Sequence, residues 1–130
     1  MVLDTSALLA VLLQEPEAMR IAQAIARDPR RLASAFTVLE TGIVVEARKG
    51  EPRGRELDLL LHGIGLESVP LTPSQVKLAR DAWRRFGKGK HPANLNRGDC
   101  CSYALSRVSG EPLLFKGTDF SKTDAAAVEY

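Results

Sequence analysis

The chain has 130 residues, of which 45% are hydrophobic and 26% charged, and its formal net charge is +2. This length suits one globular domain, residues 1–130, around a single buried core. The small net charge excludes a protein that coats nucleic acid or a membrane surface through overall charge, so any basic site must be local. The longest apolar run, Ala7–Leu13, is far shorter than the roughly 20 residues of a membrane-spanning helix.

Two features of the sequence indicate a cytoplasmic protein. The run Ala7–Leu13 is preceded by Asp4 where a signal peptide has basic residues, and Glu15 follows where cleavage would occur. The only cysteines, Cys100 and Cys101, are adjacent, and neighbours in sequence do not easily adopt disulfide geometry. We therefore expect two packed, reduced thiols, in preference to a metal or redox pair, which would need spaced ligands.

Apolar periodicity, capping residues and Gly or Pro breaks predict an alternation of short strands and longer helices. In chain order we expect a strand at 1–3, helices at 7–13 and 16–27, a strand at 31–35, helices at 36–49 and around 57–64, a strand at 66–71, helices at 73–86 and 99–108, a strand at 112–115 and a weaker strand at 125–128. Residues 87–98, rich in Gly, Asn and basic side chains, are expected to form a loop.

This alternation predicts an α/β fold with a mainly parallel central sheet of four or five strands, covered by helices on both faces. In open sheets of this kind, ligand sites lie beyond the carboxyl ends of the strands. Acidic residues that directly follow a predicted strand are therefore the first candidates for a functional site.

Two acids in the first third of the chain fit this criterion in different ways. Asp4 follows the opening strand, where it could equally be a helix N-cap. Glu40 shares a predicted apolar helix stripe with Phe36, Ile43 and Ala47. A buried carboxylate is unfavourable unless a positive group compensates it, so Glu40 indicates a metal ion or a distant base. The alternative is an acid at the rim of the stripe that turns toward solvent.

Three further acids lie near the end of the chain. Asp99 opens a helix three residues after Asn96, a spacing that suits a capping arrangement and also directs a carboxylate out of the helix start. Asp119 follows the last compact strand, and Asp124 competes with it for a fourth acidic position. Three or four carboxylates in one pocket would repel each other unless divalent cations neutralised them. An all-oxygen set suits Mg²⁺ or Mn²⁺ better than zinc.

Four stretches of the chain strongly resemble, in order and spacing, the PIN-domain toxins of VapBC toxin-antitoxin systems. These stretches are Val2–Leu8, Leu39–Glu40, Leu95–Cys100 and Leu114–Phe120. The resemblance extends nearly from end to end. It implies a PIN-like fold and a metal-dependent endoribonuclease that activates water for attack on a phosphodiester. It also implies a cognate VapB-like antitoxin as partner, RNA as substrate and a homodimer.

The resemblance assigns roles to individual residues. The acids that it implies for catalysis and for binding Mg²⁺ or Mn²⁺ are Asp4, Glu40, Asp99 and Asp119. Thr5 and Ser6 match a small hydroxyl position that orients ligands or phosphate. The basic residues beside this pocket are candidates for contacts with the RNA backbone, and an equal alternative is that they belong to a solvated charged loop. These basic residues are Lys88, Lys90, His91, Arg97 and Lys116.

Other side chains argue against alternative RNA chemistry. His62 and His91 lie in unrelated segments, so a histidine acid-base pair is poorly supported. Trp83 and Phe86 share an apolar helix stripe with Val76, which predicts that they belong to the core and leaves no platform for base stacking.

Two rival functions remain at this stage. A haloacid-dehalogenase-like phosphatase would also place a nucleophilic aspartate after the first strand, but it needs a second aspartate where this chain has Ser6. A PIN-like module without catalytic activity would not be expected to retain all of its candidate acidic ligands.

Overall fold

The computed structural model describes all residues from Met1 to Tyr130. Four short strands and six α-helices alternate along the chain, and a 3₁₀ turn precedes the carboxyl end. In chain order the elements are β1 Val2–Leu3, α1 Thr5–Leu12, α2 Ala18–Arg27, β2 Leu32–Ser34, α3 Ala35–Lys49, α4 Glu51–Gly63, β3 Glu67–Val69, α5 Pro73–Phe86, α6 Arg97–Ser109, β4 Leu113–Leu114 and η1 Phe120–Lys122.

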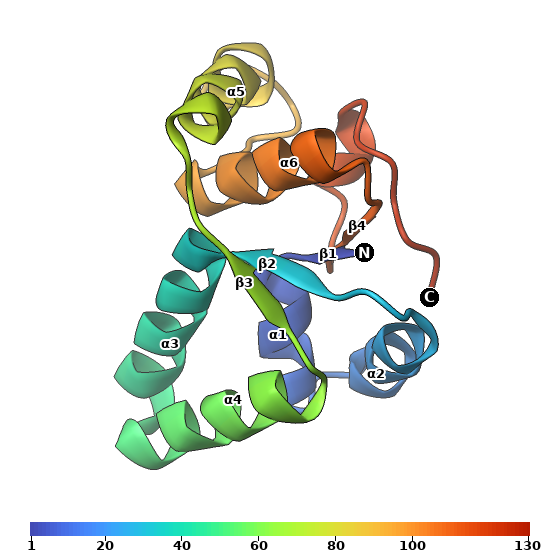
Figure 1. Ribbon diagram of the computed structural model, residues 1–130. Coiled ribbons are helices and arrows are strands. Elements are labelled where there is room, and N and C mark those ends of the chain that lie inside the picture. Colours follow the sequence, from blue (N-terminus) through green and yellow to red (C-terminus); the bar gives the residue numbers. More distant parts are fainter.

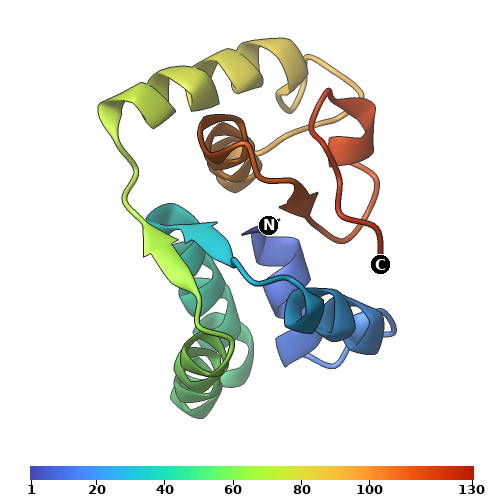
Figure 2. The same ribbon diagram turned by 45° about the vertical axis from the view of Figure 1, so that its right-hand side comes forward.

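The strands form one sheet in the order β3-β2-β1-β4, and every neighbouring pair is parallel. Helices α5 and α6 lie on one side of the sheet and α1 to α4 on the other (Figures 1 and 2). The predicted α/β fold with a parallel four-stranded sheet is confirmed. The strand expected at 125–128 is wrong, because this segment makes only an isolated bridge between Ala127 and Leu113.

The core is built around the central strand β1 and the helix α6. Val2 and Leu3 have no exposed surface, as expected for a strand that pairs with neighbours on both sides and is covered on both faces. In α6, every residue from Cys100 to Ser106 is buried. Cys100 and Cys101 are free thiols in this helix, and burial raises the pKa of both. The expectation of two packed thiols is confirmed.

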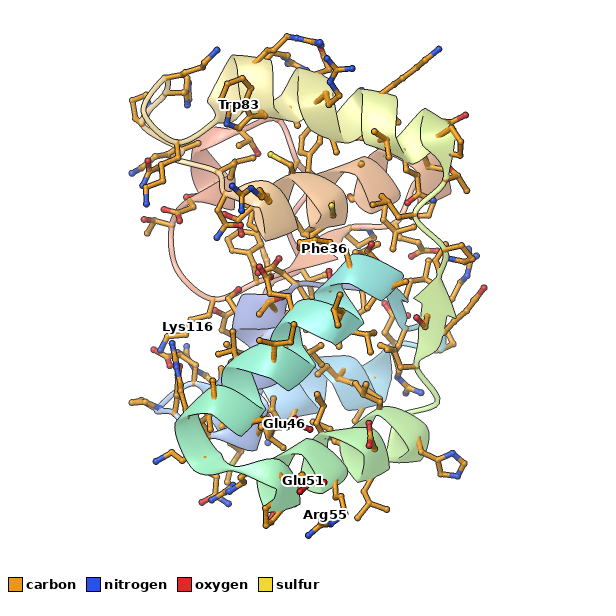
Figure 3. All side chains as sticks on the ribbon, turned by 90° about the vertical axis from the view of Figure 1, so that its left-hand side faces the viewer. Phe36, Glu46, Glu51, Arg55, Trp83 and Lys116 are labelled. Atoms are coloured by element: carbon orange, nitrogen blue, oxygen red, sulfur yellow. The ribbon has the colours of Figure 1, made fainter.

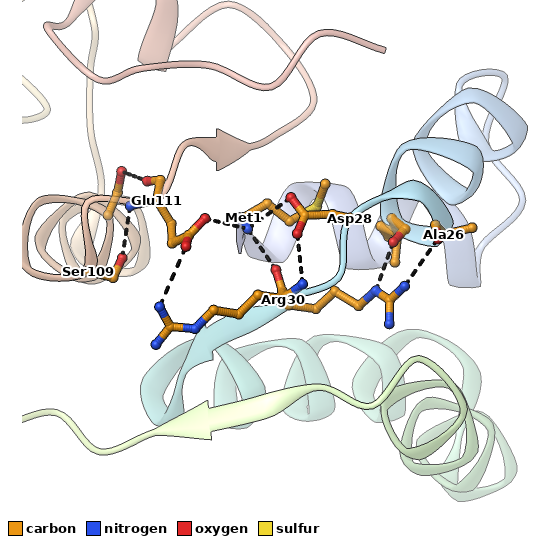
Figure 4. Close-up of polar contacts among 9 residues, drawn as sticks. Met1, Ala26, Asp28, Arg30, Ser109 and Glu111 are labelled. Atoms are coloured by element: carbon orange, nitrogen blue, oxygen red, sulfur yellow. Dashed lines mark hydrogen bonds and ion pairs between the residues drawn. The ribbon is translucent and has the colours of Figure 1, made fainter.

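Polar contacts at the amino terminus fix the entry of β1 into the sheet (Figure 4). The Met1 ammonium donates hydrogen bonds to Asp28 Oδ2 at 3.2 Å, to the Arg30 carbonyl at 2.7 Å and to Glu111 Oε2 at 3.0 Å. Because Asp28 precedes β2 and Glu111 precedes β4, these contacts tie the starts of three strands together.

Two helices expose a different face from the one that their apolar pattern predicts. The buried residues of α3 are Thr37, Thr41 and Val45, whereas Ile43 is 59% exposed. Threonines occupy the inner face because their hydroxyls find partners there: Thr41 Oγ1 donates to the Thr37 carbonyl at 2.7 Å, and Thr37 Oγ1 lies 3.3 Å from Ser102 Oγ. The predicted stripe of Phe36, Glu40, Ile43 and Ala47 is therefore not the core face of α3.

The prediction for α5 is also wrong in part. Phe86 is buried, but Trp83 is 43% exposed and Val76 is 39% exposed. Helix α5 packs mainly on α6 at the margin of the molecule (Figure 1), so only one edge of its apolar stripe is covered. No helix of the chain combines the length and the apolar character that a membrane crossing requires.

Candidate active site

The candidate acids gather at the carboxyl edge of the sheet, where the parallel strands release the chain. Asp4 directly follows β1, Glu40 lies on α3 after β2, and Asp119 follows β4. Asp99 reaches the same edge from the first turn of α6. The topology therefore brings together acids that are up to 115 positions apart in the sequence, since positions 4 and 119 both lie here.

Asp4 is the most deeply placed of these acids, with 2% of its surface exposed. It caps α1: its Oδ2 accepts hydrogen bonds from the Ser6 amide at 3.0 Å and from Ser6 Oγ at 2.7 Å. Its other oxygen, Oδ1, accepts a hydrogen bond from Ser102 Oγ at 2.7 Å. Ser6 Oγ in turn accepts a hydrogen bond from the Lys116 amide at 3.0 Å. The carboxylate is thus held between α1, α6 and the segment after β4.

Glu40 is half-buried and fixed by contacts from two other elements. Thr5 Oγ1 donates a hydrogen bond to Glu40 Oε1 at 2.6 Å. A Cβ atom added at Gly98 would lie only 2.2 Å from the same oxygen, so Glu40 packs directly against the start of α6 where a side chain is missing. Glu40 therefore reaches the site across the gap between α3 and α6.

Asp99 helps to cap the start of α6, and its pKa is raised by its surroundings. It forms the predicted capping box with Asn96, in which the Asp99 amide donates to Asn96 Oδ1 and the Asn96 amide donates to Asp99 Oδ2, each at 2.9 Å. Burial, followed by the negative charge of Asp4, raises the pKa of Asp99 from 3.8 to about 7, and the charges of Asp119 and Glu40 add to this effect. The other three acids are therefore close enough for their charges to act on Asp99.

Asp119 and Asp124 lie in different surroundings. Asp119 is exposed, and its charge acts on Asp99. Asp124 accepts a hydrogen bond from the Tyr103 hydroxyl at 2.6 Å and pairs with Arg85 at 3.2 Å, and these groups lower its pKa. The geometry favours Asp119 over Asp124 as the fourth member of the acidic cluster, because Asp124 is occupied elsewhere.

Two residues that contact the acids, Ser102 and Gly98, were not among the candidates from the sequence. Ser102 follows Asp99 by three positions, so the two residues share one face of α6, and this spacing could have identified it. Gly98 carried no such signal, because its role depends on the close approach of Glu40 from a different helix.

The basic candidates are distributed unevenly around the acids. Lys88 and Arg97 line a hollow of about 440 Å³ together with Glu40. His91 is held by its own loop, since its Nδ1 accepts a hydrogen bond from the Ala93 amide at 3.0 Å. The Lys116 ammonium pairs with Glu15 and, at 3.3 Å, with Glu17. Lys90 lies over the ring of Trp83, 4.0 Å from its centroid.

The donor set fits a hard divalent cation, although the carboxylates do not converge as they stand. No group of three or more His, Cys, Asp or Glu side chains is placed to hold one metal ion. The carboxylates of Asp4, Glu40 and Asp99 accept hydrogen bonds from Ser6, Thr5 and Asn96, respectively. Carboxylate oxygens are the ligands that Mg²⁺ and Mn²⁺ prefer. An ion would also neutralise the repulsion that raises the pKa of Asp99.

Comparison with known proteins gives a consistent result. The PIN domain family model matches residues 1–126. A protein named Ribonuclease VapC from Mycolicibacterium smegmatis is 56% identical over 98% of this chain and 99% of its own length. Ribonuclease VapC30 from Mycobacterium tuberculosis is 54% identical over 98% of each chain.

Solved structures share the fold at low sequence identity. VapC20 from Mycobacterium tuberculosis, described as a toxin that cleaves the sarcin-ricin loop, superposes with a TM-score of 0.80 at 17% identity over 99% of this chain and 98% of its own. VapBC2 from Rickettsia felis, bound to a DNA fragment from its promoter, gives a TM-score of 0.76 at 14% identity over 98% of this chain and 96% of its own.

Proposed function

This chain belongs to the PIN-domain family, as a relative of the VapC ribonucleases, and we propose that it is a Mg²⁺- or Mn²⁺-dependent endoribonuclease toxin. The proposed catalytic residues, which also bind the metal, are Asp4, Glu40, Asp99 and Asp119. The observation that supports this proposal most directly is the placement of these four acids at the carboxyl edge of the sheet, where burial and the charges of the other three raise the pKa of Asp99. A cluster of acids in such an unfavourable arrangement is typical of a functional site.

The residues of the chain have distinct tasks in this proposal. Ser6 and Ser102 hold the Asp4 carboxylate through both of its oxygens, and Thr5 orients Glu40. Asp99 is fixed by the capping box at the start of α6, where the charges of Asp4, Asp119 and Glu40 act on it. A bound divalent cation would supply Lewis acidity for activating water and for neutralising charge on the phosphodiester. Lys88 and Arg97 line the hollow beside Glu40, where they can contact phosphate oxygens.

The test is metal-dependent cleavage of RNA by the purified chain. Total cellular RNA is incubated with Mg²⁺, with Mn²⁺ or with EDTA, and the new 5′ ends are mapped. We expect cleavage only with a metal, and a loss of more than about 100-fold for Asp4→Asn and for Asp99→Asn. Asp124→Asn is the matched control, because this acid pairs with Tyr103 and Arg85, and it should retain activity if folded.

Three results would contradict the proposal. One is cleavage that persists in EDTA or in Asp4→Asn. Another is turnover of phosphate monoesters without any cleavage of RNA, which would favour the phosphatase alternative. The third is a folded chain that binds RNA and metal but cuts nothing, which would favour the inactive PIN-like module.

We also propose a VapB-like antitoxin as the partner of this chain and a homodimer as its form in solution, acting in the cytoplasm. The relationship to VapC proteins supports the partner, and the free, buried cysteines suit a reducing compartment. Large apolar side chains at the surface of α3 and α4, namely Leu39, Ile43 and Leu59, offer area for such contacts. Co-purification with the product of a neighbouring reading frame, and light scattering of the toxin alone, test these two statements.

A further inference from the structure

A groove between α5 and α6 lies next to the acidic site. Its volume is about 470 Å³, and its nine lining residues include no acid. The apolar part of the lining includes Val76, Trp83 and Cys100, and the charged part consists of Arg80, Arg84 and Arg97. An apolar floor beside three guanidinium groups suits a ligand with a flat, weakly polar body and negative charges around it.

This groove adjoins the hollow that contains Glu40. Trp83 and Arg97 line both spaces, so they form the boundary between the groove and the acidic site. Figure 3 shows Trp83 on α5 and Phe36 at the start of α3 on the same side of the molecule, and Phe36 also lines the hollow with Glu40. A polymer bound at the acids could therefore extend one unit over Trp83 without a break in the surface.

The ring of Trp83 is fixed although it is 43% exposed. A Cβ atom at Gly87 would lie 2.6 Å from Cδ1 of Trp83, so the indole packs directly on the Gly87 backbone. The Lys90 ammonium lies 4.0 Å from the ring centroid, a distance that permits a cation–π contact. An aromatic ring held in this way loses little conformational freedom on binding a ligand.

We propose that Trp83 and Arg97 bind an unpaired base of the RNA substrate beside the bond to be cleaved. The base stacks on the indole and displaces the exposed Lys90 side chain that lies over the ring in the free protein, and Arg80, Arg84 and Lys88 contact the flanking phosphates. This inference rests on the proposed ribonuclease function and adds to it a binding position for one base, which must be unpaired because only an unstacked base can reach an aromatic side chain. It replaces the expectation from the sequence that Trp83 belongs to the core.

Tryptophan fluorescence provides a direct test, because the chain contains a single tryptophan. The Asp4→Asn variant, chosen to leave RNA intact, is titrated with a short unpaired RNA and with the same sequence as a duplex. We expect the unpaired RNA to quench the Trp83 emission and the duplex to quench it little. Unchanged emission at saturating unpaired RNA would overturn the proposal, and it would favour a protein segment as the occupant of the groove.

Variants separate base stacking from a structural role. Trp83→Leu should weaken binding of labelled unpaired RNA, measured by anisotropy, by about 10-fold to 100-fold, and Trp83→Phe should restore most of it. In the active chain, Trp83→Leu should raise KM and leave kcat nearly unchanged, the signature of binding shared by ground state and transition state. Met19→Ala, which alters an exposed apolar residue of α2 outside the groove, is the control and should bind RNA like the wild type.

The outcomes also distinguish this inference from the proposed function. If the wild type cleaves RNA but Trp83→Leu binds and cleaves RNA as the wild type does, the inference fails and the ribonuclease function stands. If the wild type cleaves no RNA, the proposed function fails, and the fluorescence titration still decides whether Trp83 binds an unpaired base.

Discussion

Replacing Asp99 with asparagine should stabilise the metal-free protein while it removes the activity. In the folded chain, burial and the charge of Asp4 raise the pKa of Asp99 to about 7, against 3.8 for the isolated group. Above neutral pH the folded protein therefore carries a carboxylate in an unfavourable place. Asparagine has no charge, and its side-chain oxygen can still accept the hydrogen bond from the Asn96 amide that Asp99 Oδ2 accepts now.

The magnitude follows from the linkage between protonation and folding. Because the pKa of Asp99 is raised, its contribution to stability is fully present below pH 3.8 and is lost as the pH rises through about 7. With about 1.4 kcal/mol for each pH unit across this window, the gain from Asp99→Asn is about 2 kcal/mol at pH 5 and about 4 kcal/mol at pH 8.

The assay is urea unfolding of both proteins in EDTA at pH 5 and pH 8. Asp124→Asn is the control with the opposite sign. The hydrogen bond from Tyr103 and the nearby Arg85 lower the pKa of Asp124, so the Asp124 carboxylate stabilises the folded protein at any pH above the ordinary pKa of an aspartate. This variant should therefore lose stability at both pH 5 and pH 8. A variant Asp99→Asn that is no more stable than the wild type at pH 8, or whose gain does not grow with pH, would refute the electrostatic reasoning.

Three further predictions concern the surroundings of the acids. Gly98→Ala should displace the Glu40 carboxylate, because the added Cβ would lie 2.2 Å from Oε1. We expect at least about a 10-fold loss of RNA cleavage with little change in Tm, since only the flexible end of Glu40 must move. Full activity of this variant would contradict the role given to Gly98. Ser102→Ala removes the hydrogen bond to Asp4 Oδ1 and should lower the free energy of unfolding in urea by about 1 to 3 kcal/mol; an unchanged value would show that this bond contributes nothing. Mn²⁺ at 100 times its Kd should stabilise the wild type by about 2.7 kcal/mol in a thermal shift assay and Asp99→Asn by clearly less, whereas equal shifts would place the ion elsewhere.

The sequence predicts most of the fold and the positions of the acids. Parallel strands end at one edge of their sheet, so placing Asp4 and Asp119 after strands was enough to bring them to the same side. Glu40 was identified from an apolar stripe that is not the core face of α3 and from the family resemblance. The capping spacing between Asn96 and Asp99 predicted the start of α6 in the same way, and the capping box is present. These features are local in sequence or follow from topology alone.

The features that the sequence did not predict depend on contacts between distant elements. Hydrophobic periodicity assigned Ile43 to the inner face of α3, but Thr37 and Thr41 take that face because their hydroxyls find partners there. Likewise, apolar spacing cannot show that α5 lies at the margin of the molecule, where α6 covers Phe86 and leaves Trp83 partly open. The residues of one helix do not show which side of its apolar stripe the neighbouring helices will cover.

The position of β1 inside the sheet has a consequence for the synthesis of an enzyme that cuts RNA. This first strand pairs with β2 on one side and with β4, at Leu113–Leu114, on the other. A chain that is still growing on the ribosome lacks β4 and Asp119 until residues 113–119 have been made, and pairing over such a separation is slow. The full set of acids can therefore assemble only after these residues have been synthesised.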